Sequence, residues 1–404
     1  MSDAKAQRPT SVAPTTREPV GGSKWIDAYL GDVAEIISGQ HVLASLVNED
    51  GRGVPYLTGP SDFVGQRPHA TKWTTSPSAV CEGGDLLITV KGSGCGSIAM
   101  ADRQYAISRQ LMAIRAKEIE PGFLRPLVPF LVSMNQLIPS GTIPQFTREE
   151  LKALPTKIPP RHQQMRVAEM LSTWDEALER LSRQIEHKER LLESIRERLI
   201  HGAHRLGDRN APWPMVALSE VTRQLTGRNG DRYGRDLVMG VTKAEGIVPM
   251  REHVVAENIS RYLVLPPNGF AYNPMRINIG SIAMSEHEGD VIVSPDYVVF
   301  TCKEDRLHPR FLNHLRRTKA WADFMTIAGN GSVRVRIYYA SLAEFEFHLP
   351  PLDEQRAIVE MLDDAEREIT ALEAERAALA RQRDALATEL LTGRLRVPQA
   401  EAAS

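Results

Sequence analysis

Several short segments of this sequence approach catalytic motifs without completing them. Asn273-Pro274-Met275 comes nearest to the motif with which adenine methyltransferases hold a flipped base, but it lacks a second proline and an aromatic residue. Pro295-Asp296 could begin a metal-dependent nuclease motif, but Thr301-Cys302-Lys303 has no acid two positions before the lysine. No Gly-Lys dipeptide occurs, so the phosphate-binding loop GxxxxGK[ST] is absent. The sequence therefore predicts no catalytic site in this chain.

Metal and nucleotide sites are also weakly indicated. The acidic run from Glu286 to Asp290 contains a histidine, yet its residue types are typical of a charged surface loop. The alternating glycines from Gly92 to Gly96 are too common a pattern to indicate a nucleotide site. Cys81, Cys95 and Cys302 are far apart, which excludes a CxxC zinc knuckle and fits a reducing cytoplasm. We expect neither a metal nor a cofactor in this chain.

Length and composition predict a globular protein of two or three domains. The chain has 404 residues, of which 42% are hydrophobic, and its net charge of -2 gives no overall signature of a nucleic-acid binder. Any DNA-binding surface must therefore come from local clustering of basic residues. No apolar run approaches the roughly 20 residues that span a bilayer, and residues 1–24 lack an apolar signal segment. We expect a cytoplasmic protein.

The sequence contains two copies of one unit. The segment Leu151 to Arg205 aligns without a gap onto Leu342 to Arg396, and the pentapeptide Gly96 to Met100 recurs as Gly280 to Met284. Internal duplication predicts two similar domains related by pseudo-symmetry. Further matching pairs are Pro159/Pro350, Pro160/Pro351, Gln164/Gln355, Glu169/Glu360, Met170/Met361, Leu171/Leu362, Leu181/Leu372, Leu199/Leu390, Gly202/Gly393, Trp25/Trp213, Leu30/Leu218, Val33/Val221 and Gly39/Gly227.

Each copy ends in a heptad pattern that predicts a long helix. Apolar residues recur at alternating steps of four and three, and each run ends at a glycine suited to a C-terminal cap. Each helix would have roughly 35 residues and be about 50 Å long. A generic oligomerising coiled coil is the alternative, but two matched heptads favour an intramolecular antiparallel pair. The residues expected to pair are Val167, Leu171, Trp174, Leu178, Leu181, Ile185, Ile358, Leu362, Ile369 and Leu372.

The remaining sequence predicts the fold class. Short apolar runs between Gly, Pro and Asn breaks indicate mixed α/β domains, so we expect two pseudo-symmetric α/β domains separated by a long antiparallel two-helix coiled coil. Expected strands are Asp85 to Val90, Val291 to Val293, Tyr297 to Thr301 and Ala343 to Leu349, and expected helices are Phe123 to Met134 and Pro309 to Phe324. The predicted domains are a disordered tail (1–24), a first domain (25–158), a central helix (159–206), a second domain (213–349) and a C-terminal helix (350–397).

With this duplicated order, the chain resembles the specificity subunits of Type I restriction-modification systems (HsdS). The likeness covers nearly everything from Trp25 to Val397. In the first copy Gln163 stands where the family usually has Glu, so a helix start or partner contact could differ there. The motifs that carry the likeness are Val54-Pro55-Tyr56, Gly84-Asp85-Leu86-Leu87, Gly141-Thr142-Ile143, Gly331-Ser332-Val333, both Pro-Pro turns and the segment Leu349 to Gln355.

The resemblance implies a non-catalytic subunit that selects DNA. Each α/β domain would be a target-recognition domain that reads one half of an interrupted site in double-stranded DNA. The helices would space the domains and dock two methyltransferase subunits, which would bind S-adenosylmethionine and methylate a flipped adenine. Restriction subunits, up to two, that use ATP and Mg²⁺ would join for cleavage; the sequence leaves open whether they exist, and also the target sequence and spacer.

The candidate DNA-contacting residues are basic and amide side chains in loops. Each could equally be an ordinary solvated residue. If the second domain continues as a strand, Arg334 and Arg336 would lie on one face, and removing both should weaken binding and flatten its salt dependence. Tyr338 and Tyr339 are expected to pack. The candidates are Lys91, Ser93, Arg109, Gln110, Thr142 and Gln145 in the first domain, and Arg276, Asn278, Asn330, Ser332, Arg334 and Arg336 in the second.

The alternative class is a self-contained methyltransferase or nuclease with duplicated DNA-binding domains. The incomplete motifs argue against it. A third hypothesis is a structural scaffold whose domains bind proteins, which predicts no affinity for nucleic acid in any assembly.

Overall fold

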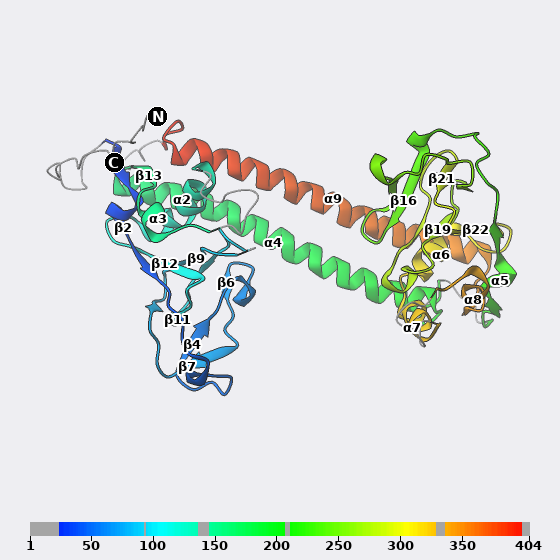
Figure 1. Cartoon of the computed structure of the whole chain (residues 1–404), viewed down its shortest axis with the longest axis horizontal. Helices are drawn as coiled ribbons and strands as arrows, with labels where there is room; N and C mark the ends of the chain where they lie inside the picture. The colour runs from blue at the N-terminus through cyan, green and yellow to red at the C-terminus, as the bar shows by residue number, and fades with distance from the viewer. Residues whose placement is uncertain (1–23, 93, 136–144, 207–210, 329–335, 398–404) are drawn as a thin grey trace, which may run out of the picture. The chain divides into compact units, whose positions relative to one another are not determined.

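The structure is a computed structural model that describes residues 24–92, 94–135, 145–206, 211–328 and 336–397. The chain divides into unit 1 (Met1–Arg180 with Ala377–Ser404) and unit 2 (Leu181–Arg376). Each unit holds one sheet-bearing domain and one half of each long helix, α4 (Arg161–Ile200) and α9 (Leu352–Leu391) (Figure 1). The expected mixed α/β class, with two sheet-bearing domains and two long helices, is confirmed. The unit boundary cuts through both helices.

Unit 1 is built around two sheets and two short strand pairs. The four-stranded sheet has the order β10-β9-β12-β2, the five-stranded sheet has the order β3-β7-β4-β11-β8, β1 pairs with β13, and β5 pairs with β6. The elements are β1 (Ile26–Tyr29), α1 (Leu30–Val33), β2 (Ala34–Ser38), β3 (Val47–Asn48), β4 (Val54–Leu57), β5 (Phe63–Val64), β6 (Arg67–Pro68), β7 (Lys72–Thr74), β8 (Val80–Cys81), β9 (Leu86–Thr89), β10 (Ile98–Met100), β11 (Tyr105–Ile107), β12 (Leu111–Ala116), α2 (Pro121–Met134), α3 (Arg148–Lys152) and β13 (Pro155–Ile158).

Strand β9 is buried along its whole length because both of its faces are covered. Leu86 and Ile88 pack in one hydrophobic cluster with α2, whereas Leu87 packs in a second cluster on the other face. Successive side chains of a strand point to opposite faces, so a strand covered on both sides needs a continuous apolar run. The expected strand from Asp85 to Val90 is thereby confirmed, within one residue at each end.

Unit 2 repeats this topology, with four strands instead of five in its second sheet. Its first sheet has the order β15-β22-β19-β20, its second sheet has the order β17-β16-β21-β18, and β14 pairs with β23. The elements are β14 (Met215–Ala217), α5 (Leu218–Val221), β15 (Thr222–Leu225), β16 (Val238–Thr242), β17 (Gly246–Pro249), β18 (Leu263–Leu265), β19 (Phe270–Tyr272), β20 (Ile282–Met284), β21 (Val291–Val293), β22 (Val298–Cys302), α6 (Pro309–Leu315), α7 (Lys319–Ala328), α8 (Tyr339–Leu342) and β23 (Glu346–His348).

The two units share strand pairings as well as strand order. In unit 1, β11 pairs with β4 in parallel and β12 lies antiparallel between β9 and β2. In unit 2, β21 pairs with β16 in parallel and β22 lies antiparallel between β19 and β15. Strand β19 also alternates between two clusters, with Phe270 and Tyr272 in one and Ala271 in the other. The duplication seen in the sequence is therefore a duplication of the fold.

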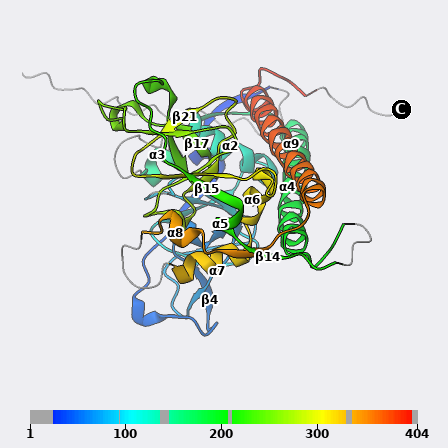
Figure 2. The same ribbon diagram turned by 90° about the vertical axis from the view of Figure 1, so that its right-hand side faces the viewer.

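The expected helix from Pro309 to Phe324 is wrong, because the structure has two helices there. α6 ends at Leu315 and α7 begins at Lys319. The Thr318 hydroxyl donates a hydrogen bond to the Leu315 carbonyl at 2.8 Å, which satisfies a carbonyl at the end of α6. The break redirects the chain so that Trp321 packs edge-on against Phe345, with ring centroids 5.0 Å apart. Figure 2 shows α6 beside α9 and α7 farther from it.

The expected strand from Ala343 to Leu349 is shorter than predicted. Ala343 caps the short helix α8, and its amide donates to the Tyr339 carbonyl at 2.8 Å. The carbonyls of Ala343 and Phe345 accept hydrogen bonds from Ser219 and Leu218. These carbonyl groups therefore have hydrogen-bond partners without pairing in a β-sheet, and the strand β23 is limited to Glu346–His348. The other expected elements of unit 2, Val291 to Val293 and Tyr297 to Thr301, match β21 and β22 to within a residue.

The halves of α4 and α9 lie antiparallel within each unit. In unit 1, Arg383 Nε is 2.9 Å from Asp175 Oδ1. In unit 2, Lys188 Nζ is 2.8 Å from Glu368 Oε1, and Arg196 bonds Glu366 at 2.8 Å. Lys188 and Arg383, which stand at heptad positions where the pattern would otherwise place an apolar residue, thus make cross-helix ion pairs. Of the residues expected to pair, Val167, Leu171, Ile185, Ile358, Leu362 and Ile369 are buried, and Trp174, Leu178, Leu181 and Leu372 are half-buried.

Each long helix ends against a tryptophan. In unit 2 a Cβ atom on Gly202 (φ +69°) would lie 3.0 Å from Trp213 Cζ3, and in unit 1 a Cβ on Gly393 (φ +72°) would lie 3.1 Å from Trp25 Cζ3. Only glycine combines this left-handed conformation with such close contact. Because Trp25 lies near the start of the sequence and Gly393 near its end, unit 1 joins distant parts of the chain.

The same tryptophans reach the start of the opposite helix. Trp213 Nε1 donates to Glu354 Oε2 at 3.1 Å, and Arg205 binds the same carboxylate through two hydrogen bonds of 2.8 and 2.9 Å. Trp25 Nε1 donates to Gln163 Oε1 at 3.0 Å. Gln163, which stands where Glu was expected, therefore still accepts the hydrogen bond of the tryptophan but carries no negative charge.

Candidate nucleic-acid interface

Three chain positions meet at the same place in each unit. They are the turn before the central strand of the four-stranded sheet, a residue two to three positions after the neighbouring strand, and the residue three positions before a short helix. In unit 1 these positions are Ser108 to Gln110, Lys91 and Gln145. In unit 2 the strand registers place Ser294 to Asp296, Met275 and Arg336 at the corresponding positions.

Backbone contacts hold the three positions together in unit 1. Lys91 and Gln145 form an isolated antiparallel bridge. The Val90 amide donates to the Gln110 carbonyl at 2.8 Å, and the Phe146 amide donates to the Val90 carbonyl at 3.1 Å. Phe146 is buried, whereas Lys91, Gln110 and Gln145 are exposed. A buried anchor thus presents one cation and two amides on a shared surface.

Arg109 and Gln110 also line a pocket of about 720 Å³ in unit 1. Lys72, Thr58 and Ser108 lie on the same pocket wall. Ser108 is buried, and its hydroxyl donates to the Thr58 carbonyl at 2.6 Å, which fixes the turn that carries Arg109. A rigid turn that presents a guanidinium and an amide can contact a phosphate and a base edge.

The glycine-rich segment after β9 is shaped by packing. Gly92 and Gly96 have φ values of +92° and +89°. A Cβ on Gly94 would lie 2.5 Å from Pro60 Cγ, so Gly94 is required by contact with the protein itself. Ser93 and Thr142 lie outside the described residues. The interpretation that these glycines let the backbone approach a phosphate stays a prediction.

In unit 2 the corresponding position forms a pocket of about 620 Å³ lined by Asn273, Met275, Asp296, Arg336 and Tyr338 among others. The Ile337 amide donates to the Pro274 carbonyl at 3.1 Å, which places Arg336 beside Met275 as Gln145 lies beside Lys91. Arg336 Nη1 donates to the Tyr338 hydroxyl at 3.3 Å, and this contact raises the pKa of Arg336.

Two expectations for this segment need correction. Arg336 lies outside any strand, and Tyr338 is 53% exposed, so it does not pack in the core. The reason is that Ile337 is the buried anchor, which turns both of its neighbours outward. Tyr339 does pack, with its ring 5.8 Å from that of Phe300. Asn330, Ser332 and Arg334 lie outside the described residues.

The remaining candidates in unit 2 flank this pocket. Arg276 precedes a short 3-10 helix (Ile277–Ile279), and Arg276 and Asn278 are both exposed and are not among the residues that line the pocket. Asn273 Oδ1 accepts a hydrogen bond from the Met275 amide at 2.9 Å. Asn273-Pro274-Met275, the nearest approach to a methyltransferase motif, is therefore a turn whose asparagine is occupied by its own backbone.

Sequence reasoning missed Asp296 as a site residue. Its carboxylate is exposed at the pocket, next to a turn in which the Asp296 amide donates to the Ser294 hydroxyl at 3.3 Å. Asp296 could have been found from its correspondence with Gln110. The loops of the two copies differ in length, and this hides the correspondence in the sequence.

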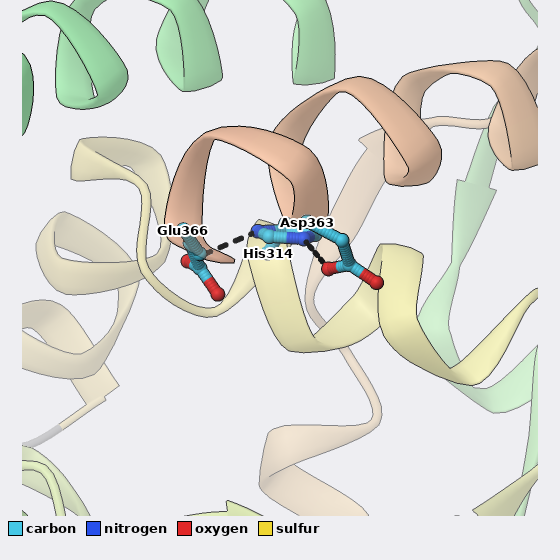
Figure 3. Close-up of side chains that lie close together, drawn as sticks. All are labelled: His314, Asp363 and Glu366. Carbon is cyan, nitrogen blue, oxygen red and sulfur yellow. Dashed lines mark hydrogen bonds and ion pairs between the residues drawn. The ribbon is translucent and has the colours of Figure 1, made fainter. Parts of the chain in front are cut away.

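A histidine between two carboxylates is the one grouping among the described residues that could hold a metal ion. His314 (1% exposed) faces Asp363 Oδ1 through Nε2 at 2.9 Å and Glu366 Oε1 through Nδ1 at 3.8 Å (Figure 3). The two ring nitrogens point to different carboxylates, which does not suit a single ion. Arg310 contacts Asp363 at 3.3 Å, and Arg196 and Arg317 both bind Glu366. The group is an ion-pair network that ties α6 to both long helices within unit 2.

Burial lowers the pKa of His314, although its hydrogen bond to Asp363 opposes the shift.

In the acidic loop from Glu286 to Asp290, Glu286 lies 3.7 Å from Arg310, and Asp290 accepts a hydrogen bond from the Tyr233 hydroxyl at 2.7 Å. Both acids are thus engaged with the protein. Within the described ranges, no helix is long and apolar enough to span a membrane.

Comparisons with known proteins agree with this geometry. The chain is 25% identical over 175 residues to the putative type I restriction enzyme MjaX specificity subunit of Methanocaldococcus jannaschii. The match covers 43% of this chain and 41% of that protein, so it spans less than half of the relative's length.

Two solved structures share the fold. The crystal structure of a Type I restriction-modification system S subunit from M. genitalium has a TM-score of 0.55 at 15% identity, covering 93% of this chain and 99% of that one. A chain from a structure on complex assembly and conformational transition of the type I R-M system has a TM-score of 0.54 at 18% identity, covering 94% and 100%. The family model for the Type I restriction modification DNA specificity domain matches residues 22–188 and 264–381, more than half of the chain. The chain therefore belongs to the family of Type I restriction-modification DNA specificity domains.

Proposed function

We propose that this chain is the sequence-specificity subunit of a Type I restriction-modification complex. The sheet-bearing domain of each unit reads one half of a bipartite, interrupted site in double-stranded DNA. The chain itself carries no catalytic site, and it acts in the cytoplasm, where its three free thiols would persist. Membership of the DNA specificity family supports this role.

The observation that carries the proposal is the repeated three-position arrangement. One fold, present twice in one chain, exposes side chains at the same three positions, and these side chains differ between the units: Lys91, Gln110 and Gln145 in unit 1, and Met275, Asp296 and Arg336 in unit 2. Two copies of one framework with different contact residues are what a reader of two different half-sites needs. A catalytic protein with duplicated binding domains would need, in addition, a reaction centre.

The long helices space the two domains and dock two methyltransferase subunits. Met165 and Leu191 on α4 and Met361 on α9 are large apolar side chains that are 45% to 54% exposed. Exposed apolar groups on helices otherwise rich in charge support a partner-binding role. The methyltransferase subunits supply S-adenosylmethionine binding and adenine flipping, and restriction subunits, where present, supply ATP- and Mg²⁺-dependent cleavage.

Co-expression with the methyltransferase encoded beside its gene tests the proposal. The full-length chain is purified with that partner and given S-adenosylmethionine and genomic DNA, and the methylated adenines are then mapped by sequencing. We expect methylation only when both proteins are present, within one asymmetric motif that an unspecified spacer interrupts. An uninterrupted motif would count against two reading domains. Methylation or cleavage by the chain alone would favour the self-contained enzyme, and no DNA affinity in any complex would favour a protein-binding scaffold.

A further inference from the structure

We propose that Arg336 with Asp296 reads a G·C pair in the half-site of unit 2, and that Gln145 with Gln110 reads an A·T pair in the half-site of unit 1. This inference rests on the proposed function and deepens it, because it assigns base preferences to particular side chains. Two features support it: the positions correspond between the units, and the side chains at those positions differ in chemistry.

The strand registers define the correspondence. Ala113 is opposite both Ile37 of β2 and Leu87 of β9, and Val299 is opposite both Leu225 of β15 and Ala271 of β19. Counting back three residues along each central strand from Ala113 and Val299 leads to Gln110 and Asp296.

The third position is fixed independently. The Phe146 amide bonds the Val90 carbonyl, and the Ile337 amide bonds the Pro274 carbonyl. Val90 and Pro274 each lie three residues beyond the register partners Leu87 and Ala271. Gln145 and Arg336, the residues before these buried anchors, are therefore equivalent, and each is exposed.

In unit 2 two side chains of opposite charge share one pocket, because Arg336 and Asp296 both line the 620 Å³ pocket. The Tyr338 hydroxyl holds the Arg336 side chain at 3.3 Å. An arginine binds guanine O6 and N7 with two hydrogen bonds, and a carboxylate accepts from cytosine N4. These are the two edges that a G·C pair offers in the major groove.

In unit 1 both positions carry an amide. Glutamine donates to adenine N7 and accepts from adenine N6, a pattern that no other base pair offers in the major groove. Gln110 Oε1 would lie 2.4 Å from a Cβ on Gly59, so the absence of a side chain at Gly59 leaves room for Gln110. The neighbouring Lys91 supplies a positive charge for the phosphate backbone of the DNA, whereas unit 2 has the uncharged Met275 at this position.

The experiment selects bound sequences from a library of randomised double-stranded DNA. The full-length chain, purified with its methyltransferase partner, is compared with Arg336→Gln, which gives unit 2 the residue of unit 1, and with Gln145→Arg, which does the reverse. We expect Arg336→Gln to replace guanine by adenine at one position of the second half-site, and Gln145→Arg to replace adenine by guanine in the first. One bidentate contact corresponds to about 5- to 150-fold discrimination between bases. Asp296→Asn should weaken the preference for the same G·C pair.

Arg223→Gln is the matched control. Arg223 is exposed on β15, where its neighbour Gln224 lines the pocket, whereas Arg223 lines a different pocket with Thr301 and Lys303. Its replacement should leave both half-sites unchanged. If the unaltered complex selects an interrupted motif but Arg336→Gln and Gln145→Arg leave the bases unchanged, or change the other half, the base assignment is overturned and the proposed function stands. If the unaltered complex selects no interrupted motif, both fall.

Discussion

Gln163 and Glu354 occupy the same position in the two units and differ by one charge. Each accepts a hydrogen bond from a tryptophan indole at about 3 Å, but Glu354 also binds Arg205, whose guanidinium lies 4.7 Å from the Trp213 ring centroid. A buried carboxylate needs a cation to offset its desolvation, and a buried amide does not. Glutamine can therefore stand at this position in unit 1, because the hydrogen bond and not the charge is common to both units.

At the same scale, His314 should make the stability of unit 2 depend on pH. Burial lowers its pKa below the ordinary value of 6.5, so the unfolded chain binds this proton more readily than the folded chain does. The contribution is fully present above about pH 6.5, and it is lost as the pH falls through 6.5 toward the lower folded value. We expect the free energy of unfolding to decrease by up to about 1.4 kcal/mol per pH unit in that range. Urea unfolding measured at several pH values checks this.

His314→Gln should flatten this pH dependence, even where it also lowers the stability at neutral pH. His253→Gln, which changes an exposed histidine of the same unit, is the control and should leave the slope unchanged. The groups that face His314 are Asp363, Glu366 and the arginines bound to them. Equal slopes for the unaltered chain and His314→Gln would contradict the assignment.

At the scale of elements, the spacing of apolar residues in the sequence predicted those helices and strands whose burial produces a regular apolar pattern. The heptads predicted α4 and α9, although each helix has 40 residues and not roughly 35, and apolar runs predicted β9, β21 and β22 but missed β12 and β19. The break between α6 and α7 was missed because neither proline nor glycine marks it. A hydroxyl of Thr318 and the burial of Trp321 cause it, and neither depends on a local sequence pattern.

The candidate site was predictable only in part. Lys91, Gln110, Gln145 and Arg336 were predicted from residue type, and the structure brings the first three together in unit 1. Asp296 was missed because an acidic residue is not typical of a DNA-binding surface. Its equivalence with Gln110 follows from strand register, which a sequence with drifting loop lengths does not reveal.

The glycines that end the long helices offer a test at this scale. Gly202→Ala and Gly393→Ala should each destabilise the protein by about 2 kcal/mol, because alanine is strained at positive φ and its Cβ would meet a tryptophan ring. Thermal or urea unfolding measures the loss. Gly51→Ala is the matched control, since Gly51 has φ +79° and no atom within 4 Å of the position that a Cβ would take, so it reports the backbone strain alone. A loss no larger than that of Gly51→Ala would show that the tryptophan contact contributes nothing.

At the scale of the whole molecule, the two units differ in how the chain assembles them. The core of unit 1 contains Leu30 and Ile36 near the start of the sequence together with Ala387, Leu390 and Leu391 of α9. Unit 2, by contrast, is one continuous segment, Leu181–Arg376. Unit 2 takes core residues from the first part of α9, and only unit 1 takes core residues from the segment after Arg376.

Removal of the residues after Arg376 should unfold the first domain rather than the second. The truncation deletes the buried leucines Leu390 and Leu391 from the core of unit 1, and a single large-to-small core change already costs about 2 to 5 kcal/mol. Hydrogen exchange read by mass spectrometry should show loss of protection in peptides from β2, β9 and β12, while peptides from β19 and β22 stay protected. Loss of protection confined to unit 2 would contradict the division of the chain.

This division has a consequence for synthesis on the ribosome. The domain that emerges first lacks part of its core until the part of α9 after Arg376 has been made, whereas the domain made second is completed by the earlier part of the same helix. The earlier domain must therefore wait, with apolar surface uncovered, for the whole of the later one. A stop codon just after Arg376 would therefore impair the domain translated first, far from the codons that encode most of that domain.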